Sequence, residues 1–231
     1  YRKKWKEAGV KPSDLKTLKD LSKFPVIEKE DLRRAQEEKP PFGSYLCVST
    51  KEVARIHGTS GTTGVPTIFG ISSDDWNRIA NAHARILCAG GLRPEDSVFI
   101  GSFFSLYVGS WGMMAGAERL GATVFPFGAG IAGQTAGAAR FIGRMKPSCF
   151  YGTPSYALRL AEVAREEGFD PRKDFAFTKM FFSGEPGAGI LHMKKQLESA
   201  FGAKVIDMGS MAEMTPWMTN AECSERTGMH L

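Results

Sequence analysis

The sequence predicts an α/β domain with mostly parallel sheets covered by helices, preceded by a helical extension. From residue 51 onward, short apolar segments alternate with longer segments that have helical periodicity. The apolar segments are continuous rather than alternating with polar residues, which is typical of strands buried on both faces. The segments between them are long enough to form helical crossovers, and such crossovers join parallel strands with right-handed connections.

The first 50 residues are expected to form short helices and turns. Helical periodicity is expected at 14–21 and at 28–38, and it is broken by Pro25 and by KPPFG at 39–43. We therefore divide the chain into an N-terminal helical segment at 1–50 and an α/β domain at 51–231.

Strands and helices are expected to alternate through the rest of the chain, without an internal repeat. The helix after the second strand should begin at Ser73 or Asp74, which are good N-caps, and should end at Gly90. The expected strands are 52–57, 66–71, 96–102, 122–127, 148–152, 178–184 and 203–209. The other expected helices are 109–121, 134–145, 154–168 and 190–202.

Composition and charge favour a globular protein that does not bind nucleic acid or a membrane. The 231 residues are 42% hydrophobic, which is enough for a sizeable core, and the net charge is only +5. Basic residues are concentrated in YRKKWK at 1–6, whereas a nucleic-acid site needs a longer basic stripe with interleaved aromatic residues. No apolar run is long enough to span a bilayer, and we expect neither a membrane span nor a signal peptide within these residues.

Cysteine usage and the chain ends suggest where the chain belongs. Its four cysteines have no pairing spacing, which suits a reducing compartment, so a cytoplasmic location is expected. The chain starts at Tyr1 rather than Met and ends in GMHL, so we expect it to be a piece of a longer protein.

The segment TSGTTG at 59–64 lies between two expected strands and is a candidate phosphate-binding loop. Its glycines allow turns that direct successive backbone N–H groups at one anion, and its hydroxyls add further donors. The Walker A spacing is absent and no lysine follows, which excludes that class of loop. From these residues alone, a flexible turn between two strands remains the alternative.

Three further loops follow expected strands, where ligands bind in open α/β sheets. GAGIAG at 128–133 matches G-x-G-x-x-G, but residues 134–161 contain no Asp or Glu for a ribose, which disfavours a dinucleotide fold. SGEPGAG at 183–189 suits helix capping, with Pro186 at the helix start and Glu185 near the dipole.

The fourth candidate loop, at 207–216, carries two acidic residues. Asp207 ends the strand, and Glu213 lies among small residues, where a glutamate is normally solvated but can hold Mg²⁺ beside bound phosphates. The sequence contains no G-x-S-x-G, and its histidines are scattered, so a hydrolase is not favoured.

Thr59–Pro66, read as TSGTTGVP, resembles the phosphate-loop signature of the adenylate-forming (ANL) superfamily. The N-terminal segment YRKKWKEAGVKPSDL and the later stretches GAERLGATVFPF, GTPSYAL, SGEPG and AECSERTGMHL resemble the phenylacetate–CoA ligase branch. The resemblance covers essentially the whole chain and implies the large N-terminal domain of such a ligase. The C-terminal lid with its catalytic lysine, and the ribose-binding Thr-Gly-Asp motif, are expected after residue 231.

The resemblance implies an activity and roles for individual residues. The family joins a carboxylate to ATP, forming an acyl-adenylate and pyrophosphate, and then transfers the acyl group to CoA. The implied partners are therefore a small aryl or acyl carboxylic acid and CoA, with a homodimer as a candidate assembly. The implied residues are Thr59, Ser60, Gly61, Thr62, Thr63 and Gly64 for phosphates, Gly184, Glu185, Pro186, Asp207, Met208, Gly209 and Ser210 for the nucleotide, Glu213 for catalysis and Mg²⁺, and Tyr107, Tyr151 and Phe182 for the acyl pocket.

Several positions depart from the family pattern. Val65 stands where a lysine is usual, Ala212 replaces a phosphate-contacting Thr or Ser, and Gly209 replaces an aromatic residue that stacks on adenine. Loss of this stacking is expected to cost about 1–3 kcal/mol of binding, by analogy with base–aromatic contacts. Met208 and Trp217 are candidate substitutes.

Cys223 and His230 are candidate zinc ligands, because thiolate and imidazole suit Zn²⁺, although a lone Cys/His pair is more often unliganded.

We expect an AMP-forming carboxylate–CoA ligase that is not competent as this piece alone. The alternatives are an adenylating enzyme with another acceptor and a non-catalytic nucleotide-binding module.

Overall fold

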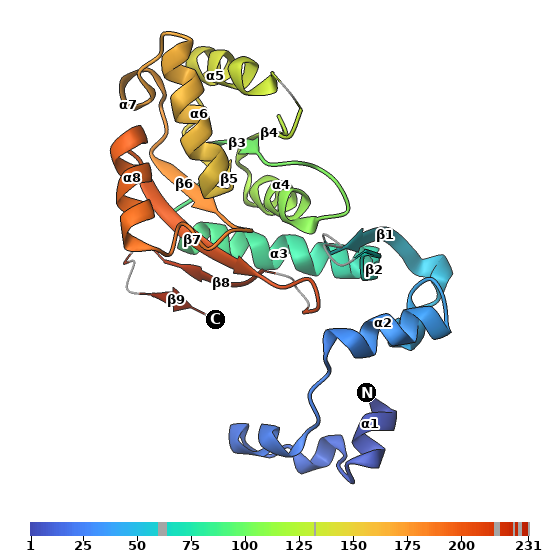
Figure 1. Cartoon of the computed structure of the whole chain (residues 1–231). Helices are drawn as coiled ribbons and strands as arrows, with labels where there is room; N and C mark the ends of the chain where they lie inside the picture. Colours follow the sequence, from blue (N-terminus) through green and yellow to red (C-terminus); the bar gives the residue numbers. More distant parts are fainter. Residues whose placement is uncertain (60–63, 132, 215–217, 224, 226–227, 231) are drawn as a thin grey trace. The chain divides into compact units, whose positions relative to one another are not determined.

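The computed structural model describes the chain except for residues 60–63, 132, 215–217, 224, 226–227 and 231 (Figure 1). It consists of two compact units, residues 1–72 and residues 73–231, which are described separately. None of the helices in the described residues is long and apolar enough to cross a membrane.

The first unit combines short helical segments with one small sheet. β1 (Val53–Gly58) and β2 (Ile68–Ser72) form an antiparallel pair on either side of the TSGTTG loop, close to the two predicted strands. The helical segments are α1 (Arg2–Glu7), α2 (Lys29–Glu38) and the 3₁₀ turns η1 (Pro12–Asp14), η2 (Leu18–Lys23), η3 (Gly43–Tyr45) and η4 (Thr50–Glu52).

The helix predicted at 28–38 is confirmed as α2, but the helix predicted at 14–21 is wrong. That segment contains the end of η1 and the start of η2 instead. The Asp14 carboxylate accepts a hydrogen bond from the Lys11 N–H, and the Asp20 carboxylate accepts one from the Thr17 N–H. Such local side-chain bonds offer the backbone an alternative to a continuous helix.

The second unit contains a sheet with the strand order β4-β3-β5-β6-β7-β8-β9. The parallel strands are β4 (Thr123–Phe125), β3 (Ser97–Gly101), β5 (Cys149–Gly152), β6 (Lys179–Phe182) and β7 (Lys204–Ser210). All five are at predicted positions, which confirms the mostly parallel sheet. β8 (Met218–Glu222) and β9 (Met229–His230) add antiparallel to one edge and were not predicted.

Helices cover both faces of this sheet, which confirms the predicted fold class (Figure 1). One core cluster contains residues of α5, α6 and α8, and the other contains residues of α3 and α4. Neighbouring strand residues alternate between them: Phe150 is buried in the first cluster and Tyr151 in the second. The helices are α3 (Ser73–Ala89), α4 (Val108–Leu120), α5 (Gln134–Met145), α6 (Pro154–Glu166), α7 (Pro171–Asp174) and α8 (Leu191–Phe201).

α3 and α4 approach each other closely at His83. A Cβ on Gly112 would lie 2.4 Å from the His83 Nε2, so only glycine fits there. The other ring nitrogen, Nδ1, lies 2.8 Å from the carbonyl oxygen of Ile79. Burial lowers the pKa of His83 from 6.5 to about 4, so this histidine is neutral in the folded protein near neutral pH.

Candidate functional site

The candidate site lies at the carboxyl ends of β3, β5, β6 and β7. Parallel strands end at one edge of a sheet, and the loops that follow them bring together residues distant in sequence. Here those loops carry Tyr107, the turn at Gly184, and Glu213. This is the edge at which the sequence analysis expected ligand binding.

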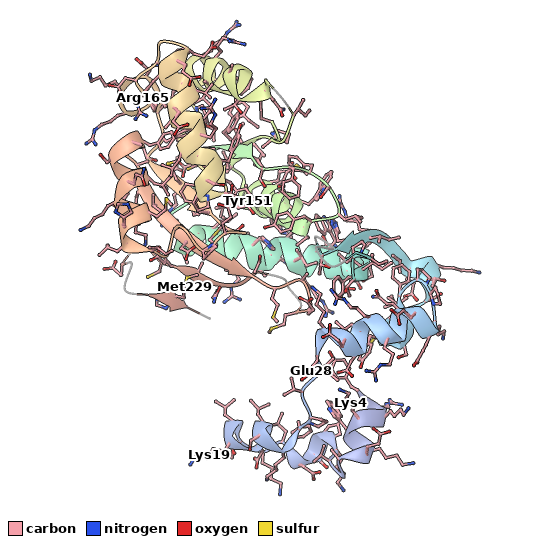
Figure 2. All side chains as sticks on the ribbon, viewed as in Figure 1. Lys4, Lys19, Glu28, Tyr151, Arg165 and Met229 are labelled. Atoms are coloured by element: carbon pink, nitrogen blue, oxygen red, sulfur yellow. The ribbon has the colours of Figure 1, made fainter. Side chains whose placement is uncertain are left out.

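Three hydroxyl groups meet at this edge. The Tyr151 hydroxyl, on β5, lies 2.7 Å from the Ser183 Oγ, directly after β6. The Tyr107 hydroxyl, in the loop after β3, lies 3.4 Å from the same Oγ. Tyr151 is 1% exposed, and burial followed by the effect of neighbouring Tyr107 raises the pKa of its hydroxyl well above the ordinary value. Figure 2 labels Tyr151 among the side chains of the second unit.

The structure brings Tyr107 and Tyr151 together but does not bring Phe182 to them, and their shared acyl-pocket role stays a prediction. Phe182 is fully buried in the core cluster on the opposite face, with its ring 5.8 Å from that of Phe150. Ser183 was missed by the sequence analysis. Its position directly after a buried strand was the signal, but only the register between strands shows that it meets Tyr151.

The turn at Gly184–Pro186 has a different side-chain role from the one expected. The Glu185 carboxylate accepts hydrogen bonds from the Ser155 Oγ at 2.7 Å and from the Ser155 N–H at 3.1 Å. Ser155 is in the first turn of α6, so Glu185 caps the helix that comes earlier in the chain. Gly184 has a φ of +85°, in the left-handed region that favours glycine.

A buried ion pair supports the middle of β7. The Lys194 Nζ lies 2.6 Å from both carboxylate oxygens of Glu222, and Glu222 also accepts a hydrogen bond from the Asp207 N–H at 3.0 Å. Asp207 is half-buried, and burial, followed by the neighbouring Glu222 charge, raises the pKa of its carboxyl group. Sequence reasoning did not find Lys194 or Glu222, because their contact depends on how α8 packs against β8.

The residues after Asp207 point in different directions. Met208 is 3% exposed and packs into the core, so its side chain is not available to stack on a base. Gly209 pairs with Asn220 of β8, and a Cβ on Gly209 would lie 1.7 Å from the Asn220 Oδ1. An aromatic residue at 209 therefore requires Asn220 to move. Ser210 is exposed, and Trp217 lies outside the described residues.

Glu213 is half-buried in the turn after β7, and Ala212 precedes it there.

The phosphate loop belongs to the first unit. Its ends are closed by two hydrogen bonds: the Thr59 N–H donates to the Thr67 carbonyl oxygen at 3.0 Å, and the Thr67 N–H donates to the Thr59 Oγ1 at 3.2 Å. Gly64 has a φ of +117°, and Ser60, Gly61, Thr62 and Thr63 lie outside the described residues.

Cys223 and His230 lie at the antiparallel edge of the sheet. Cys223 directly follows β8, and His230 is in β9, opposite Ala221. The Cys223 Sγ accepts a hydrogen bond from the Glu225 N–H at 3.4 Å. Within the described part of the chain, no group of three or more His, Cys, Asp or Glu side chains is arranged to hold a metal ion.

The candidate site lies at the carboxyl ends of parallel strands, and comparison with known proteins places the chain in a family. The family model for AMP-binding enzymes matches residues 5–230. The chain belongs to this family. A phenylacetate–coenzyme A ligase of Pseudomonas putida is 36% identical over 97% of this chain and 49% of its own length. The corresponding enzyme of Escherichia coli K12 is 36% identical over 98% of this chain and 50% of its own length.

Solved structures show the same relationship. A 2-hydroxyisobutyryl-CoA ligase in complex with 2-HIB-AMP and CoA is 55% identical, with a TM-score of 0.95, over 99% of this chain and 48% of that chain. An anthranilate CoA ligase is 21% identical with a TM-score of 0.55, over 75% of this chain and 32% of that chain, which shows the shared fold alone. The chain thus spans about half the length of the curated relatives it matches. The predicted resemblance to phenylacetate–CoA ligases is confirmed.

Proposed function

We propose that the protein containing this chain is an ATP-dependent, AMP-forming carboxylate–CoA ligase. The observation that carries this proposal is its 55% identity to a CoA ligase whose structure holds an acyl-adenylate and CoA, over 99% of this chain. The similarity to phenylacetate–coenzyme A ligases supports the same reaction class.

The proposed reaction has two steps. A carboxylate oxygen attacks the α-phosphorus of ATP, the bond to the bridging oxygen breaks, and pyrophosphate leaves to give an acyl-adenylate. The CoA thiol then loses its proton and attacks the acyl carbonyl carbon, and AMP leaves with the electrons of the acyl–phosphate bond. Donors placed where charge develops in such steps lower their barriers.

We assign different residues of this chain to the phosphates and to the nucleoside of ATP. We assign the backbone N–H groups of residues 59–64 to the β- and γ-phosphates, and Gly184–Pro186 with Asp207–Ser210 to the nucleoside. Because Glu185 caps α6 and Met208 is buried, their backbone atoms rather than their side chains are the groups assigned to this contact.

The residues of this chain suit a Mg²⁺ ion better than a structural zinc ion. Mg²⁺ is usually held by one or two carboxylates together with substrate phosphates, and the half-buried Glu213 after β7 fits that mode. A bound Mg²⁺ would neutralise phosphate charge. A structural zinc site needs four ligands, and the described residues around Cys223 and His230 do not supply them, so we do not include zinc.

A small 2-hydroxy acid is the proposed carboxylate, in preference to an aryl acid. The chain is 55% identical to a 2-hydroxyisobutyryl-CoA ligase but 36% identical to phenylacetate–coenzyme A ligases. The hydroxyl groups of Tyr107, Tyr151 and Ser183 also make this edge of the sheet more polar than an aryl ring requires.

All four cysteines are free thiols, which supports a cytoplasmic setting.

Carboxylate-dependent ATP–pyrophosphate exchange and CoA-thioester formation by the full-length protein test the proposal. We expect both activities with 2-hydroxyisobutyrate, and we expect Glu213→Ala to lower exchange by about 10²–10³-fold through lost transition-state stabilisation. Formation of AMP without thioester would assign another acceptor. Absence of exchange with every carboxylate would instead identify a nucleotide-binding module and refute the ligase.

A further inference from the structure

Burial fixes the direction of hydrogen bonding in the cluster of Tyr107, Tyr151 and Ser183. Each hydroxyl group donates one proton, and the Tyr151 hydroxyl is fully buried. If Ser183 donated to Tyr151, the Tyr151 proton would have to turn to its other neighbour, the Tyr107 hydroxyl, and would give up the 2.7 Å contact with the Ser183 Oγ. A weakened hydrogen bond is costly for a buried donor. Tyr151 therefore donates to Ser183.

The chain of hydroxyl groups ends at Tyr107. Because Ser183 accepts from Tyr151, its own proton is directed to the Tyr107 oxygen at 3.4 Å. The Tyr107 proton then points away from the cluster. Tyr107 is half-buried, and its ring is held against Gly109, where a Cβ would lie 2.3 Å from the ring atoms. The cluster thus fixes one hydroxyl donor at the carboxyl edge of the sheet.

Two exposed apolar side chains lie in the same loop as this donor. Phe103, in the same loop, is 47% exposed, and its ring lies 5.5 Å from that of Tyr107. Leu106 is 44% exposed beside them in sequence. A neutral donor next to apolar groups suits a ligand that has one hydroxyl group and methyl branches.

We propose that Tyr107 determines the preference for a 2-hydroxy acid by donating a hydrogen bond to the oxygen of its 2-hydroxyl group. Ser183 and Tyr151 are positioning residues that hold the Tyr107 hydroxyl and set its direction. Phe103 and Leu106 contact the methyl groups. This inference rests on the proposed ligase function and names the residue by which the enzyme distinguishes its substrate from an unhydroxylated acid.

The test compares two acids with the same carbon skeleton, 2-hydroxyisobutyrate and isobutyrate, in pyrophosphate exchange by the full-length enzyme. A site built to bind a hydroxyl group rejects the analogue that lacks it, so the unmodified enzyme should prefer the hydroxy acid. We expect Tyr107→Phe to lower kcat/KM about 10-fold for 2-hydroxyisobutyrate and less than about 2-fold for isobutyrate. Tyr45→Phe, which removes a tyrosine hydroxyl in the other unit, should change neither.

Ser183 variants test the positioning role. Ser183→Ala should lower kcat/KM for the hydroxy acid about 3-fold, mainly through KM, whereas Ser183→Thr keeps a hydroxyl group and should restore it. Equal losses for both acids in Tyr107→Phe would overturn the proposal. So would an unmodified enzyme that uses both acids equally well, although its ligase function would stand. Absence of exchange with any acid would remove the proposed function itself.

Discussion

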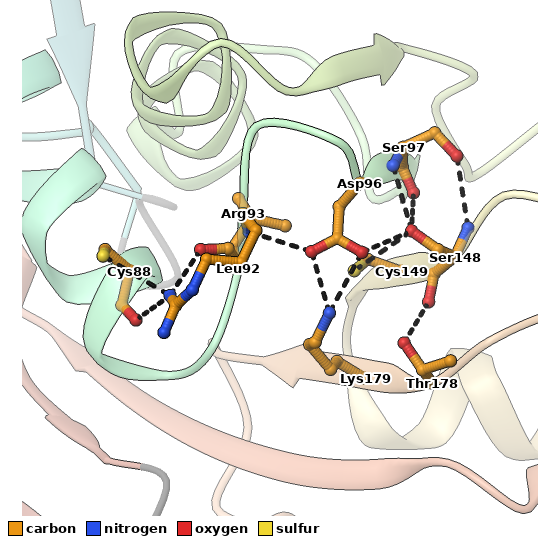
Figure 3. Close-up of polar contacts among 9 residues, drawn as sticks. All are labelled: Cys88, Leu92, Arg93, Asp96, Ser97, Ser148, Cys149, Thr178 and Lys179. Carbon is orange, nitrogen blue, oxygen red and sulfur yellow. Dashed lines mark hydrogen bonds and ion pairs between the residues drawn. The ribbon is translucent and has the colours of Figure 1, made fainter.

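The two edges of the parallel sheet in residues 73–231 are built from different chemistry. At the amino edge, where β3, β5 and β6 begin, an ion pair joins Asp96 and Lys179 (Figure 3). At the carboxyl edge of the same strands, hydroxyl groups of Tyr107, Tyr151 and Ser183 meet instead. The same strands therefore begin at an ion pair and end at a cluster of hydroxyl groups.

At the amino edge, the hydrogen-bonding capacity of Asp96 is used within the protein. Its carboxylate accepts bonds from the Lys179 Nζ at 2.8 and 3.0 Å, from the Ser148 Oγ at 2.8 Å and from the Arg93 N–H at 2.8 Å (Figure 3). Burial opposes ionisation of Asp96, but these bonds outweigh it and hold the pKa of the carboxyl below its ordinary value. Cys149 lies beside them, and burial raises the pKa of its thiol to about 12.

The carboxyl edge is where we propose that a ligand binds. Its hydroxyl chain ends in a donor that points away, and burial raises the pKa of Asp207 rather than lowering it. The difference teaches that the polar groups of the amino edge serve the sheet itself, whereas the carboxyl edge is the one to which we assign binding. Substitutions at the two edges should therefore separate stability from substrate preference.

The largest loss of stability is expected from Lys194→Ala, behind the carboxyl edge. The Lys194 and Glu222 side chains are 9% and 10% exposed, and removing the cation leaves a buried carboxylate unpaired. We expect the free energy of unfolding to fall by about 3–5 kcal/mol, measured by urea unfolding of the full-length protein. The matched control is Lys194→Met with Glu222→Met, which should recover much of the loss. A loss below about 1 kcal/mol would show that the pair does not support β7.

As the pH falls, protonation of His83, between α3 and α4, should lower the stability of the protein before protonation of Asp96 at the amino edge does. His83 has a folded-state pKa of about 4 and an ordinary value of 6.5, so the unfolded state binds the extra proton between these values. The contribution of His83 to the free energy of unfolding is therefore fully present above pH 6.5, and it falls by about 3 kcal/mol as the pH drops to 4. Asp96, whose pKa is lowered, loses its contribution only below its ordinary value of 3.8.

Unfolding measured between pH 7 and pH 4 checks this order. His83→Gln removes the titrating ring, and its stability should depend less on pH over that range. An unchanged slope in this variant would assign the acid sensitivity to other groups.

The next effect is expected from Asp96→Asn at the amino edge. The amide keeps the shape of the carboxylate but loses its charge, and Lys179, which is 23% exposed, can turn to water. We expect a loss of about 2 kcal/mol in unfolding free energy. The ratio of kcat/KM for 2-hydroxyisobutyrate and isobutyrate should not change. A changed ratio would show that the two edges are not independent.

The buried strands and the helices between them could be predicted from sequence because their signal is local. A strand buried on both faces needs a continuous apolar run, as at Met180–Phe182 of β6. β8 was missed because three of the four residues Thr219–Glu222 are polar and the strand lies toward the edge of the sheet, where no continuous apolar run is required. The helix expected at 14–21 failed because aspartate side chains bond to the backbone there.

The candidate site was only partly predictable because its contacts depend on strand register. Family resemblance indicated Tyr107 and Tyr151, which do meet, but it also indicated Phe182, which the alternation of β6 places on the opposite face. Ser183 is one residue later and meets Tyr151. Sequence patterns do not show which of two adjacent residues faces which layer when both are apolar or small.

A smaller effect is expected at Gly209, where the family pattern has an aromatic residue. A Cβ there would lie 1.7 Å from the Asn220 Oδ1, so Gly209→Ala should lower stability by about 1–2 kcal/mol through overpacking. Asn220→Ala opens this space. The double variant should therefore be more stable than the two single losses predict, as a double-mutant cycle of unfolding free energies measures. Additive losses would mean that the two side chains do not compete for space.

The smallest effect on stability is expected from Tyr151→Phe, which removes the buried start of the hydroxyl chain. The phenyl ring still fills the core, and one hydrogen bond is lost, so the unfolding free energy should fall by about 1 kcal/mol. Ser183 then has no buried donor to accept from, and its proton is no longer directed to Tyr107. We expect the preference for 2-hydroxyisobutyrate over isobutyrate to fall about 2-fold, in contrast to Asp96→Asn, which costs more stability and leaves the preference intact. If Tyr151→Phe lowers stability without changing the preference, Tyr107 holds its direction without help from the buried hydroxyl, and the binding role of the carboxyl edge narrows to that one side chain.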